Sequence, residues 1–370
     1  MRYLMLNKAE QDRLLSAFTP RRRRRQKRCL LPDHTRPGLR SLIVRSAFIV
    51  SVVLGMLAGP FLAAAQPPQK VFRVGHLSAG GRTPDGAPPG PLREGLRGLG
   101  YVEGQNVAYE ARFAEGKVER LPGLAAELVG LKVDAIVAQG GPAAAAAKQA
   151  TSTIPIVTAP AAGDNVAAGL IASLARPGGN VTGLTDESAQ LSAKRMEILR
   201  EAVPKAALIA VLWNTNDQGM TLRYREIEKA ARILKIEVQP LGVREPDDFA
   251  GAFSAMTRRR PDAMFLVADT LTTMNRKQLI EFAATHRIPA MYEYSFIVRD
   301  GGLMSYGPSF EDGFRKAAVY LDRIFKGAKP ADLPAEQPTR YYLTVNLKTA
   351  ATLGLTITPL LLLRTDDVVQ

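Results

Sequence analysis

Short apolar runs alternate with amphipathic segments along the chain from about residue 70 onward. The apolar runs are rich in Val, Ile, Leu and Ala, as in strands that are buried on both faces of a sheet. The segments between them repeat apolar residues at spacings of three and four, as in Leu121, Leu124, Leu128 and Leu131, which predicts helices packed on that sheet. The predicted strands are 71–77, 106–113, 135–138, 154–159, 181–184, 208–213, 237–243, 263–267, 289–294, 303–306 and 341–345. The predicted helices are 92–99, 121–131, 143–150, 170–174, 194–203, 222–234, 249–256, 276–285, 314–325 and 346–353.

These elements form two series of alternating strands and helices. A chain of 370 residues has room for two domains of ordinary size. Because parallel strands need helical crossovers, the alternation predicts an α/β protein with two doubly wound lobes. The last elements are too few for a third domain, so we expect them to complete both sheets and the chain to cross between the lobes more than once. We assign residues 66–184 plus about 308–338 to the first lobe, and residues 185–307 plus about 339–370 to the second.

The excess of positive charge lies at the N-terminus. The first 65 residues carry 13 of the 49 Lys and Arg residues, but only 3 of the 35 Asp and Glu residues. An apolar segment, 46–62, follows this basic region and leads into Ala63-Ala64-Ala65, the order found in a secretory signal peptide. We predict that translation starts downstream of Met1 and that the signal is cleaved after Ala65 on export to the periplasm. An uncleaved N-terminal membrane anchor is the alternative.

Several chemistries are not expected. The single cysteine, Cys29, lies in the part predicted to be removed, so the mature chain is expected to form no disulfide and no Cys-based metal site. The sequence contains no Gly-x-Ser-x-Gly, Walker A or His-Glu-x-x-His motif. The arginine run 258–260 has no aromatic residues interleaved, so nucleic-acid binding is not expected. We expect no cofactor and no metal.

The stretch 133–166 indicates a small-molecule site. A buried strand there ends in Gly140-Gly141-Pro142, and an alanine-rich helix follows. Pro142 suits the first turn of a helix, whose free amides attract an anion. The next strand ends in a loop with Asp164, whose carboxylate attracts a cation. The helix amides and the Asp164 carboxylate, side by side at one edge of a sheet, suit a zwitterion such as an amino acid. The alternative is that Asp164 is only a turn residue.

Five segments carry a resemblance to a known family. They are GLRGLGYVEGQN (95–106), IPIV (154–157), LARPGGNVTGL (174–184), GGLMSYG (301–307), and FKGAKPADLP (325–334) with NLKTA (346–350). Together they resemble the substrate-binding proteins of ABC importers associated with tryptophan and tyrosine uptake. The resemblance implies the type I periplasmic-binding-protein fold, with two α/β lobes, three crossings and a ligand in the cleft. It also implies a monomer that closes on its ligand and docks on a permease in the inner membrane.

The resemblance further suggests which residues contact the ligand. Asn165 stands where the family commonly has Pro, so we expect a less rigid loop there. We expect Asp164 to hold the ligand's ammonium group and Tyr292 to stack on its side chain. The expected ligand-binding residues are Ser78, Ala79, Gly140, Gly141, Pro142, Ala143, Ala144, Ala161, Asp164, Asn214, Asn216, Asp269, Tyr292 and Glu293.

Two other functions stay open at this point. Asp164, Asp269 and Glu293 could form a carboxylate pair for acid–base catalysis in the cleft. A ligand-sensing domain of a transcription regulator shares the two-lobe fold. It would need a helix-turn-helix ahead of the first lobe, where the apolar segment 46–62 stands instead.

Overall fold

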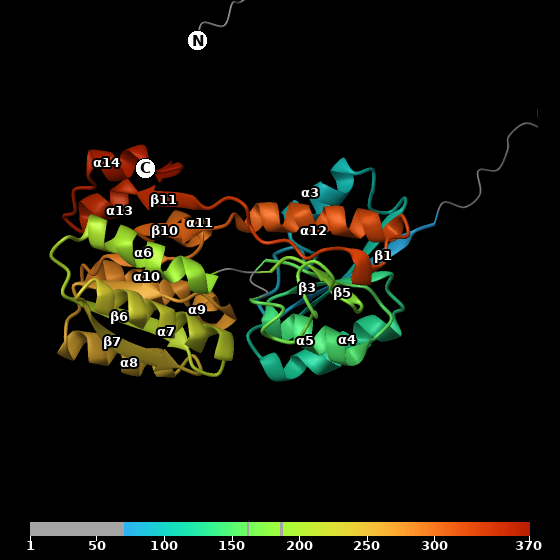
Figure 1. Cartoon of the computed structure of the whole chain (residues 1–370), viewed down its shortest axis with the longest axis horizontal. Helices are drawn as coiled ribbons and strands as arrows, with labels where there is room; N and C mark the ends of the chain where they lie inside the picture. The colour runs from blue at the N-terminus through green and yellow to red at the C-terminus, as the bar shows by residue number, and fades with distance from the viewer. Residues whose placement is uncertain (1–69, 161–162, 186–187) are drawn as a thin grey trace, which may run out of the picture. The chain divides into compact units, whose positions relative to one another are not determined.

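The computed structural model describes residues 70–160, 163–185 and 188–370 (Figure 1). Within that part the chain builds two sheets, and helices cover both faces of each. The predicted signal peptide and its cleavage site lie outside the described residues, as does Ala161.

The first lobe is built on a parallel sheet of five strands in the order β2-β1-β3-β4-β5. Its strands are β1 (Phe72–Ser78), β2 (Val107–Phe113), β3 (Ala135–Gln139), β4 (Ile156–Thr158) and β5 (Val181–Gly183). Its helices are α3 (Gly90–Gly98), η1 (Val118–Arg120), α4 (Leu121–Gly130), α5 (Gly141–Ala150), α12 (Phe310–Phe325) and η2 (Pro330–Asp332).

Strand periodicity decides which helices cover each face of this sheet. Along β3, Ile136 and Ala138 lie in one core with residues of α4 and α5, whereas Ala135 and Val137 lie in another with residues of α3 and α12. Alternate residues of a strand point to opposite faces, so an unbroken apolar run fills both cores. Gly95 of α3 allows a close crossing with α12, because a Cβ at that position would lie 2.9 Å from Cβ of Ala318.

The second lobe is built on a sheet of seven strands in the order β12-β11-β10-β9-β8-β6-β7, in which only β10 and β11 pair antiparallel. Its strands are β6 (Leu208–Asn214), β7 (Glu237–Val243), β8 (Ala263–Leu266), β9 (Ala290–Tyr292), β10 (Met304–Gly307), β11 (Tyr342–Asn346) and β12 (Asp367–Val369). Its helices are α6 (Ser188–Ala202), α7 (Gln218–Ile233), α8 (Asp248–Arg258), α9 (Thr270–Met274), α10 (Arg276–Thr285), α11 (Ser295–Arg299), α13 (Leu347–Thr352) and α14 (Pro359–Leu363).

The same alternation sorts the helices of the second lobe. On β6, Ile209 and Val211 pack with residues of α6, α7, α13 and α14, whereas Ala210 and Leu212 pack with residues of α8, α10 and α11. The predicted fold class, two doubly wound α/β lobes with more than one crossing, is confirmed.

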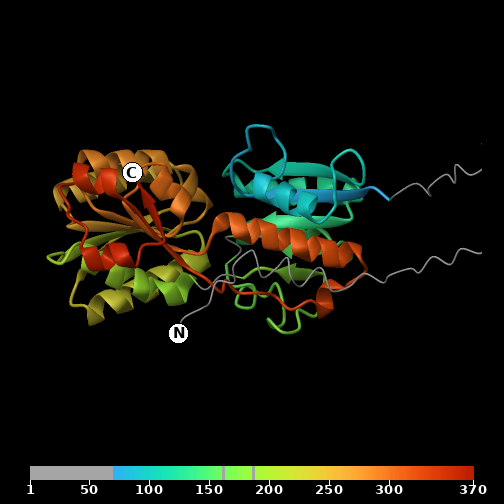
Figure 2. The ribbon, with the colours of Figure 1, turned by 90° about the horizontal axis from the view of Figure 1, so that it is seen from above.

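The chain passes between the two sheets three times, from β5 to α6, from β10 to α12, and from η2 to β11. Helix α12 therefore follows a strand of the second lobe but packs against α3 of the first, as Figure 2 shows. Its first turn is fixed by Ser309, whose hydroxyl accepts a hydrogen bond of 3.0 Å from the amide of Asp312.

One predicted helix is wrong. Residues 170–174 form bends rather than a helix. The amides of Leu170 and Ile171 both donate to the carbonyl oxygen of Asn165, at 2.8 and 3.2 Å, and both side chains enter the core beneath α5. Because the amides of Leu170 and Ile171 are bonded within a turn, the spacing of apolar residues at 170–174 reflects their burial and not the period of a helix.

Candidate ligand-binding pocket

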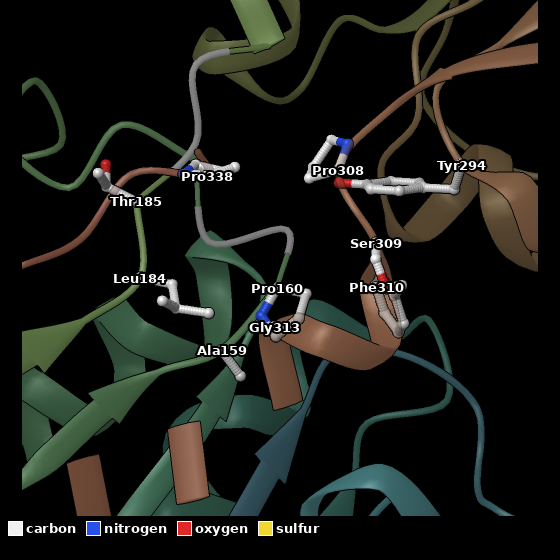
Figure 3. Close-up of a pocket in the computed structure, with 10 residues that line it drawn as sticks. All are labelled: Ala159, Pro160, Leu184, Thr185, Tyr294, Pro308, Ser309, Phe310, Gly313 and Pro338. Atoms are coloured by element: carbon white, nitrogen blue, oxygen red, sulfur yellow. The ribbon is translucent and has the colours of Figure 1, made fainter. Parts of the chain in front are cut away.

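A pocket lies where the crossing segments leave the two sheets (Figure 3). Segments after β4 and β5 line it from the first lobe, the segment after β9 lines it from the second, and the crossings into α12 and β11 complete it. Its volume is about 40 Å³, room for about three water molecules. The lining residues are Ala159, Pro160, Leu184, Thr185, Tyr294, Pro308, Ser309, Phe310, Gly313 and Pro338.

Aromatic rings form one wall of the pocket. Tyr294 and Phe310 meet edge to face with ring centroids 5.5 Å apart, and both contact Phe296, at 5.7 and 5.4 Å. Phe310 also meets Phe314 at 5.4 Å, which anchors the wall in the core of the first lobe. Such contacts hold a flat apolar surface in one orientation, suited to an aromatic or aliphatic group.

The start of α12 is pressed against the first lobe at this pocket. A Cβ at Gly313 would lie only 2.3 Å from Cγ of Pro160, so only glycine permits this approach. The glycine thus brings the first turn of α12, with Phe310, next to the end of β4.

The polar groups of the pocket also organise its walls. Thr185 accepts a hydrogen bond from the amide of Asn165 and donates one to the carbonyl oxygen of Gly163, both at 3.2 Å. Asn165 is fully buried, and its amide group donates to Oγ1 of Thr158 at 3.0 Å and to the carbonyl oxygen of Leu184 at 2.8 Å. The side chain of Asn165 thus fastens the loop to two strands, and the expectation of a less rigid loop stays a prediction.

Asp164 lies beside this network but is exposed. Its Oδ1 accepts from the amides of Val166 and Ala167, at 2.9 and 3.0 Å. The carboxylate therefore caps its own turn, which is the alternative that the sequence left open. One oxygen accepting two amides leaves the other available to a cation.

The remaining first-lobe residues of the prediction lie at the ends of β1 and β3. Ser78 and Ala79 are buried, and the hydroxyl of Ser78 accepts from the amide of Gly80 at 3.0 Å. Gly140 has a φ of 89°, and α5 begins directly after it. Ala143 and Ala144 are fully buried.

Asn214, Asn216 and Asp269 come together at the ends of β6 and β8 in the second lobe. The amide group of Asn214 donates to Asp269 at 2.6 Å, and its Oδ1 accepts from the amide of Asn216 at 2.9 Å. Asp269 also caps α9 by accepting from the amide of Thr272 at 2.9 Å. Burial raises the pKa of Asp269, although these hydrogen bonds act against the shift.

Tyr292 and Glu293 lie inside the second lobe. Tyr292 is 1% exposed and packs in the core with Leu279 and Ile297, and burial raises its pKa far above the ordinary value. Glu293 is fully buried between Arg195 and Arg223, at 3.1 and 2.8 Å. It is Tyr294, the next aromatic residue, that lines the pocket.

The sequence prediction therefore missed the aromatic wall and the proline that faces it. Tyr294 belongs to a Tyr-Glu-Tyr run at the end of β9, in which Tyr292 packs in the core and Glu293 is buried, whereas Tyr294 lines the pocket. Phe310 carries no local signal, because it reaches the first lobe only through the return of α12. A proline directly after a buried strand was the one available hint.

Among residues 70–160, 163–185 and 188–370, no helix is long and apolar enough to cross a membrane. The same residues contain no group of three or more His, Cys, Asp or Glu side chains placed to hold a metal ion.

Two layered α/β lobes joined by three crossings, with a pocket at the crossings, are the architecture of a two-lobe protein that binds a small molecule. The family model described as ABC transporter substrate binding protein matches residues 89–369, and the chain belongs to this family. It is thus the solute-binding component of an ABC transporter.

Individual relatives agree with this assignment. The tyrosine-binding protein of Clostridioides difficile (strain R20291) is 29% identical over 240 residues, which cover 65% of this chain and 68% of the relative. A conserved domain protein from Vibrio cholerae has a similar structure, with a TM-score of 0.75 and 26% identity over 81% of this chain and all of that one. The ABC domain from Streptococcus pneumonia, solved in complex with L-Trp, shares the fold at a TM-score of 0.74 and 24% identity, with the same coverage.

More distant structures extend the fold beyond this family. An ABC sugar transporter subunit from Rhodobacter sphaeroides shares it at a TM-score of 0.52 and 14% identity, over 74% of this chain and 98% of that one. A LacI family transcriptional regulator from Bifidobacterium animalis also shares the fold. Its TM-score is 0.50 and its identity 16%, over 73% of this chain and 95% of that one. The type I assignment is confirmed, and the regulator alternative rests on the fold alone.

Proposed function

We propose that this protein captures an amino acid with an aromatic or large apolar side chain and delivers it to the permease of an ABC importer. The observation that carries the proposal is the aromatic wall of Tyr294 and Phe310 in a pocket at the crossings. A tyrosine-binding relative and a similar domain holding L-Trp support the same ligand class.

The ligand's side chain would lie against the aromatic wall, opposite Pro160 and Leu184. In the widened pocket its carboxylate would face the first amides of α5, since a helix N-terminus favours negative charge; these amides do not line the pocket as it stands. Its ammonium group would approach the oxygen of Asp164 that is not used in the turn. A charge-assisted hydrogen bond of this kind contributes about 1.5–3 kcal/mol net.

A cavity with room for about three water molecules is too small for an aromatic amino acid. The pocket must therefore widen for the ligand to enter, by motion of one lobe relative to the other about the segments that join them. Opening and closing of two lobes about such segments is an established mode of domain motion. In this proposal the closed, loaded form docks on the permease, outside the cytoplasm.

Cleft catalysis has less support. Glu293 is held between two arginines, Asp269 caps a helix, and Asp164 caps a turn. Each is used in the architecture, which favours binding without turnover.

The test is isothermal titration calorimetry of the chain from residue 66 onward with L-tryptophan, L-tyrosine, L-leucine and benzoate. We expect saturable binding of the aromatic amino acids, and at least tenfold weaker binding by Tyr294→Ala and Phe310→Ala. Tyr224→Ala removes an aromatic residue that stacks on Trp213 away from the pocket, and it should leave affinity unchanged. No binding of any amino acid, or equal affinity in all variants, would refute the proposal.

Asp164 needs a pair of variants because its carboxylate already caps a turn. Asp164→Asn keeps an oxygen for the amides of Val166 and Ala167 but removes the charge, whereas Asp164→Ala removes both. If the carboxylate holds the ammonium group, both variants lose at least tenfold in affinity. Wild-type affinity in Asp164→Asn would show that the carboxylate only caps the turn and does not bind the ligand.

A further inference from the structure

A buried charged cluster in the second lobe lies directly behind the pocket. It consists of Arg195 on α6, Arg223 on α7 and Glu293 after β9, which we call the Arg-Glu-Arg cluster. Arg195 and Glu293 are 0% exposed and Arg223 is 4% exposed. Removing three charges from water costs several kcal/mol per ion, and an apolar cluster of equal volume often stabilises a fold as well or better. Stability alone is therefore a weak reason for this cluster.

The contacts of the cluster reach two segments that shape the pocket. Glu293 uses Oε1 for Arg195, at 3.1 Å, and Oε2 for Arg223, at 2.8 Å. Both oxygens of one carboxylate are thus fixed by guanidinium groups on different helices. The residue that follows Glu293 is Tyr294, which lines the pocket.

Arg195 also holds the second crossing. Its Nε donates to the carbonyl oxygen of Tyr306 on β10, at 2.6 Å. Gly307 follows, and a Cβ at that position would lie 2.0 Å from the carbonyl oxygen of Glu293 and 3.4 Å from Nη2 of Arg195. The backbones of the Tyr294 segment and of β10 are therefore packed as closely as glycine allows, and Arg195 bonds to the backbone of β10 and to the side chain of Glu293.

Arg223 connects the cluster to the end of β8. Its Nη1 lies 3.5 Å from the carbonyl oxygen of Ala268, the residue before the helix cap Asp269. Through the two arginines, the carboxylate of Glu293 thus connects three parts of the second lobe. These are α6, which follows the first crossing, β10, which precedes the second crossing, and the end of β8.

We propose that Arg195, Glu293 and Arg223 are positioning residues, which hold Tyr294 and the second crossing in the geometry that binds the ligand. The inference rests on the proposed function, since it takes the Tyr294 pocket as the ligand site. A guanidinium presents a planar fork of donors that fixes direction as well as distance. An apolar cluster of the same volume fills the space without fixing the angle of the Glu293–Tyr294 backbone.

The experiment separates positioning from stability. The triple variant Arg195→Met, Glu293→Leu, Arg223→Met replaces the charges with apolar side chains of similar size, and Glu293→Asp keeps the charge but shortens the side chain by one methylene. We expect both to unfold cooperatively in urea, and to bind L-tryptophan and L-tyrosine at least tenfold more weakly than the wild type. The double variant Lys194→Gln, Glu197→Gln, which breaks an exposed ion pair on the same helix, is the matched control and should bind as the wild type does.

Each outcome decides the matter. Wild-type affinity in a folded triple variant overturns the inference and leaves the proposed function in place. If the triple variant fails to fold, Glu293→Asp decides alone: a folded protein with a tenfold loss supports positioning, whereas unchanged affinity, or unfolding here as well, assigns the cluster to stability. If the wild-type protein binds neither L-tryptophan nor L-tyrosine, the proposed function itself is refuted, and the comparison of variants does not arise.

Discussion

The two lobes fix their pocket segments by different chemistry. In the first lobe, the Pro160 and Thr185 segments are held by neutral hydrogen bonds from Asn165 and Thr158. In the second, the Tyr294 segment is held by a buried carboxylate between two arginines. A neutral network loses little when one member is removed, whereas a charged network leaves an unpaired ion in the core. The second lobe is therefore expected to tolerate substitution at its pocket far less well.

The two lobes also treat their buried ionisable groups differently. The first buries His76 between Phe113 and Phe314, and no hydrogen-bond partner for either ring nitrogen occurs in the described part of the chain. The second pairs every charge of its Arg-Glu-Arg cluster. One lobe thus keeps a neutral group that must stay neutral, and the other keeps charges that must stay paired.

The largest effect is expected from Glu293→Ala. Two buried guanidinium groups would lose their shared carboxylate, so we expect the free energy of unfolding to fall by about 3–5 kcal/mol. Urea denaturation followed by circular dichroism measures it. Glu226→Ala, which breaks an exposed pair with Lys229, should change stability by less than about 1 kcal/mol. Equal losses in both variants would contradict the contrast between buried and exposed pairs.

Acid should act mainly through the first lobe. Burial lowers the pKa of His76 from 6.5 to about 4, so the folded state resists protonation that the unfolded chain accepts. The contribution of His76 is complete above pH 6.5 and is lost as the pH falls toward 4, by about 3 kcal/mol in all. Urea titrations at pH 7, 5.5 and 4.5 should show this loss in the wild type and in His286→Gln. In His76→Leu the loss should be smaller by that amount, and an unchanged pH dependence would argue against a buried neutral imidazole.

Asn165→Ala is the first-lobe counterpart of the Glu293 substitution. It removes the hydrogen bonds to Thr158 and Leu184, and should lower the free energy of unfolding by about 1–3 kcal/mol. Asn216→Ala, at an exposed position, should stay within about 0.5 kcal/mol of the wild type. A loss at Asn165 as large as that at Glu293 would remove the difference between the lobes.

The smallest effect is expected where the start of α12 packs against Pro160 of the first lobe. Gly313→Ala places a methyl group against Pro160 and should shift the start of α12, weakening binding of L-tryptophan about tenfold, or about 1.4 kcal/mol. Gly251→Ala in α8, where a Cβ would meet no atom within 4 Å, should leave binding unchanged. Calorimetry compares the two, and equal affinities would show that the close approach at Gly313 is not needed for binding.

Local patterns predicted most of the strands and helices because each pattern reflects burial along one element. The continuous apolar run of β3 and the Leu spacing of α4 are two such cases. The prediction failed at residues 170–174, where buried leucine and isoleucine belong to a turn organised by Asn165. Apolar spacing reports which residues are buried, and the hydrogen bonds decide whether they are helical.

The candidate site was harder to predict than the fold. Strand ends were the right places to look, since the pocket is lined by residues after β4, β5 and β9. The orientation of individual side chains there could not be read from the sequence: Tyr292 enters the core and Tyr294 the pocket, although both flank the same buried glutamate.

The sequence by itself determined the alternation of strands and helices, the two-lobe α/β class and, through its resemblance to a family, the solute-binding role. These depend on periodicity and on motifs that are local in the chain. Only the tertiary structure decided that Pro160 lies against Gly313, that Tyr294 meets Phe310, and that Arg195 and Arg223 share Glu293. Each of the last two ion pairs joins residues 70 or more positions apart, and only the three crossings and the sheet order bring such distant residues together.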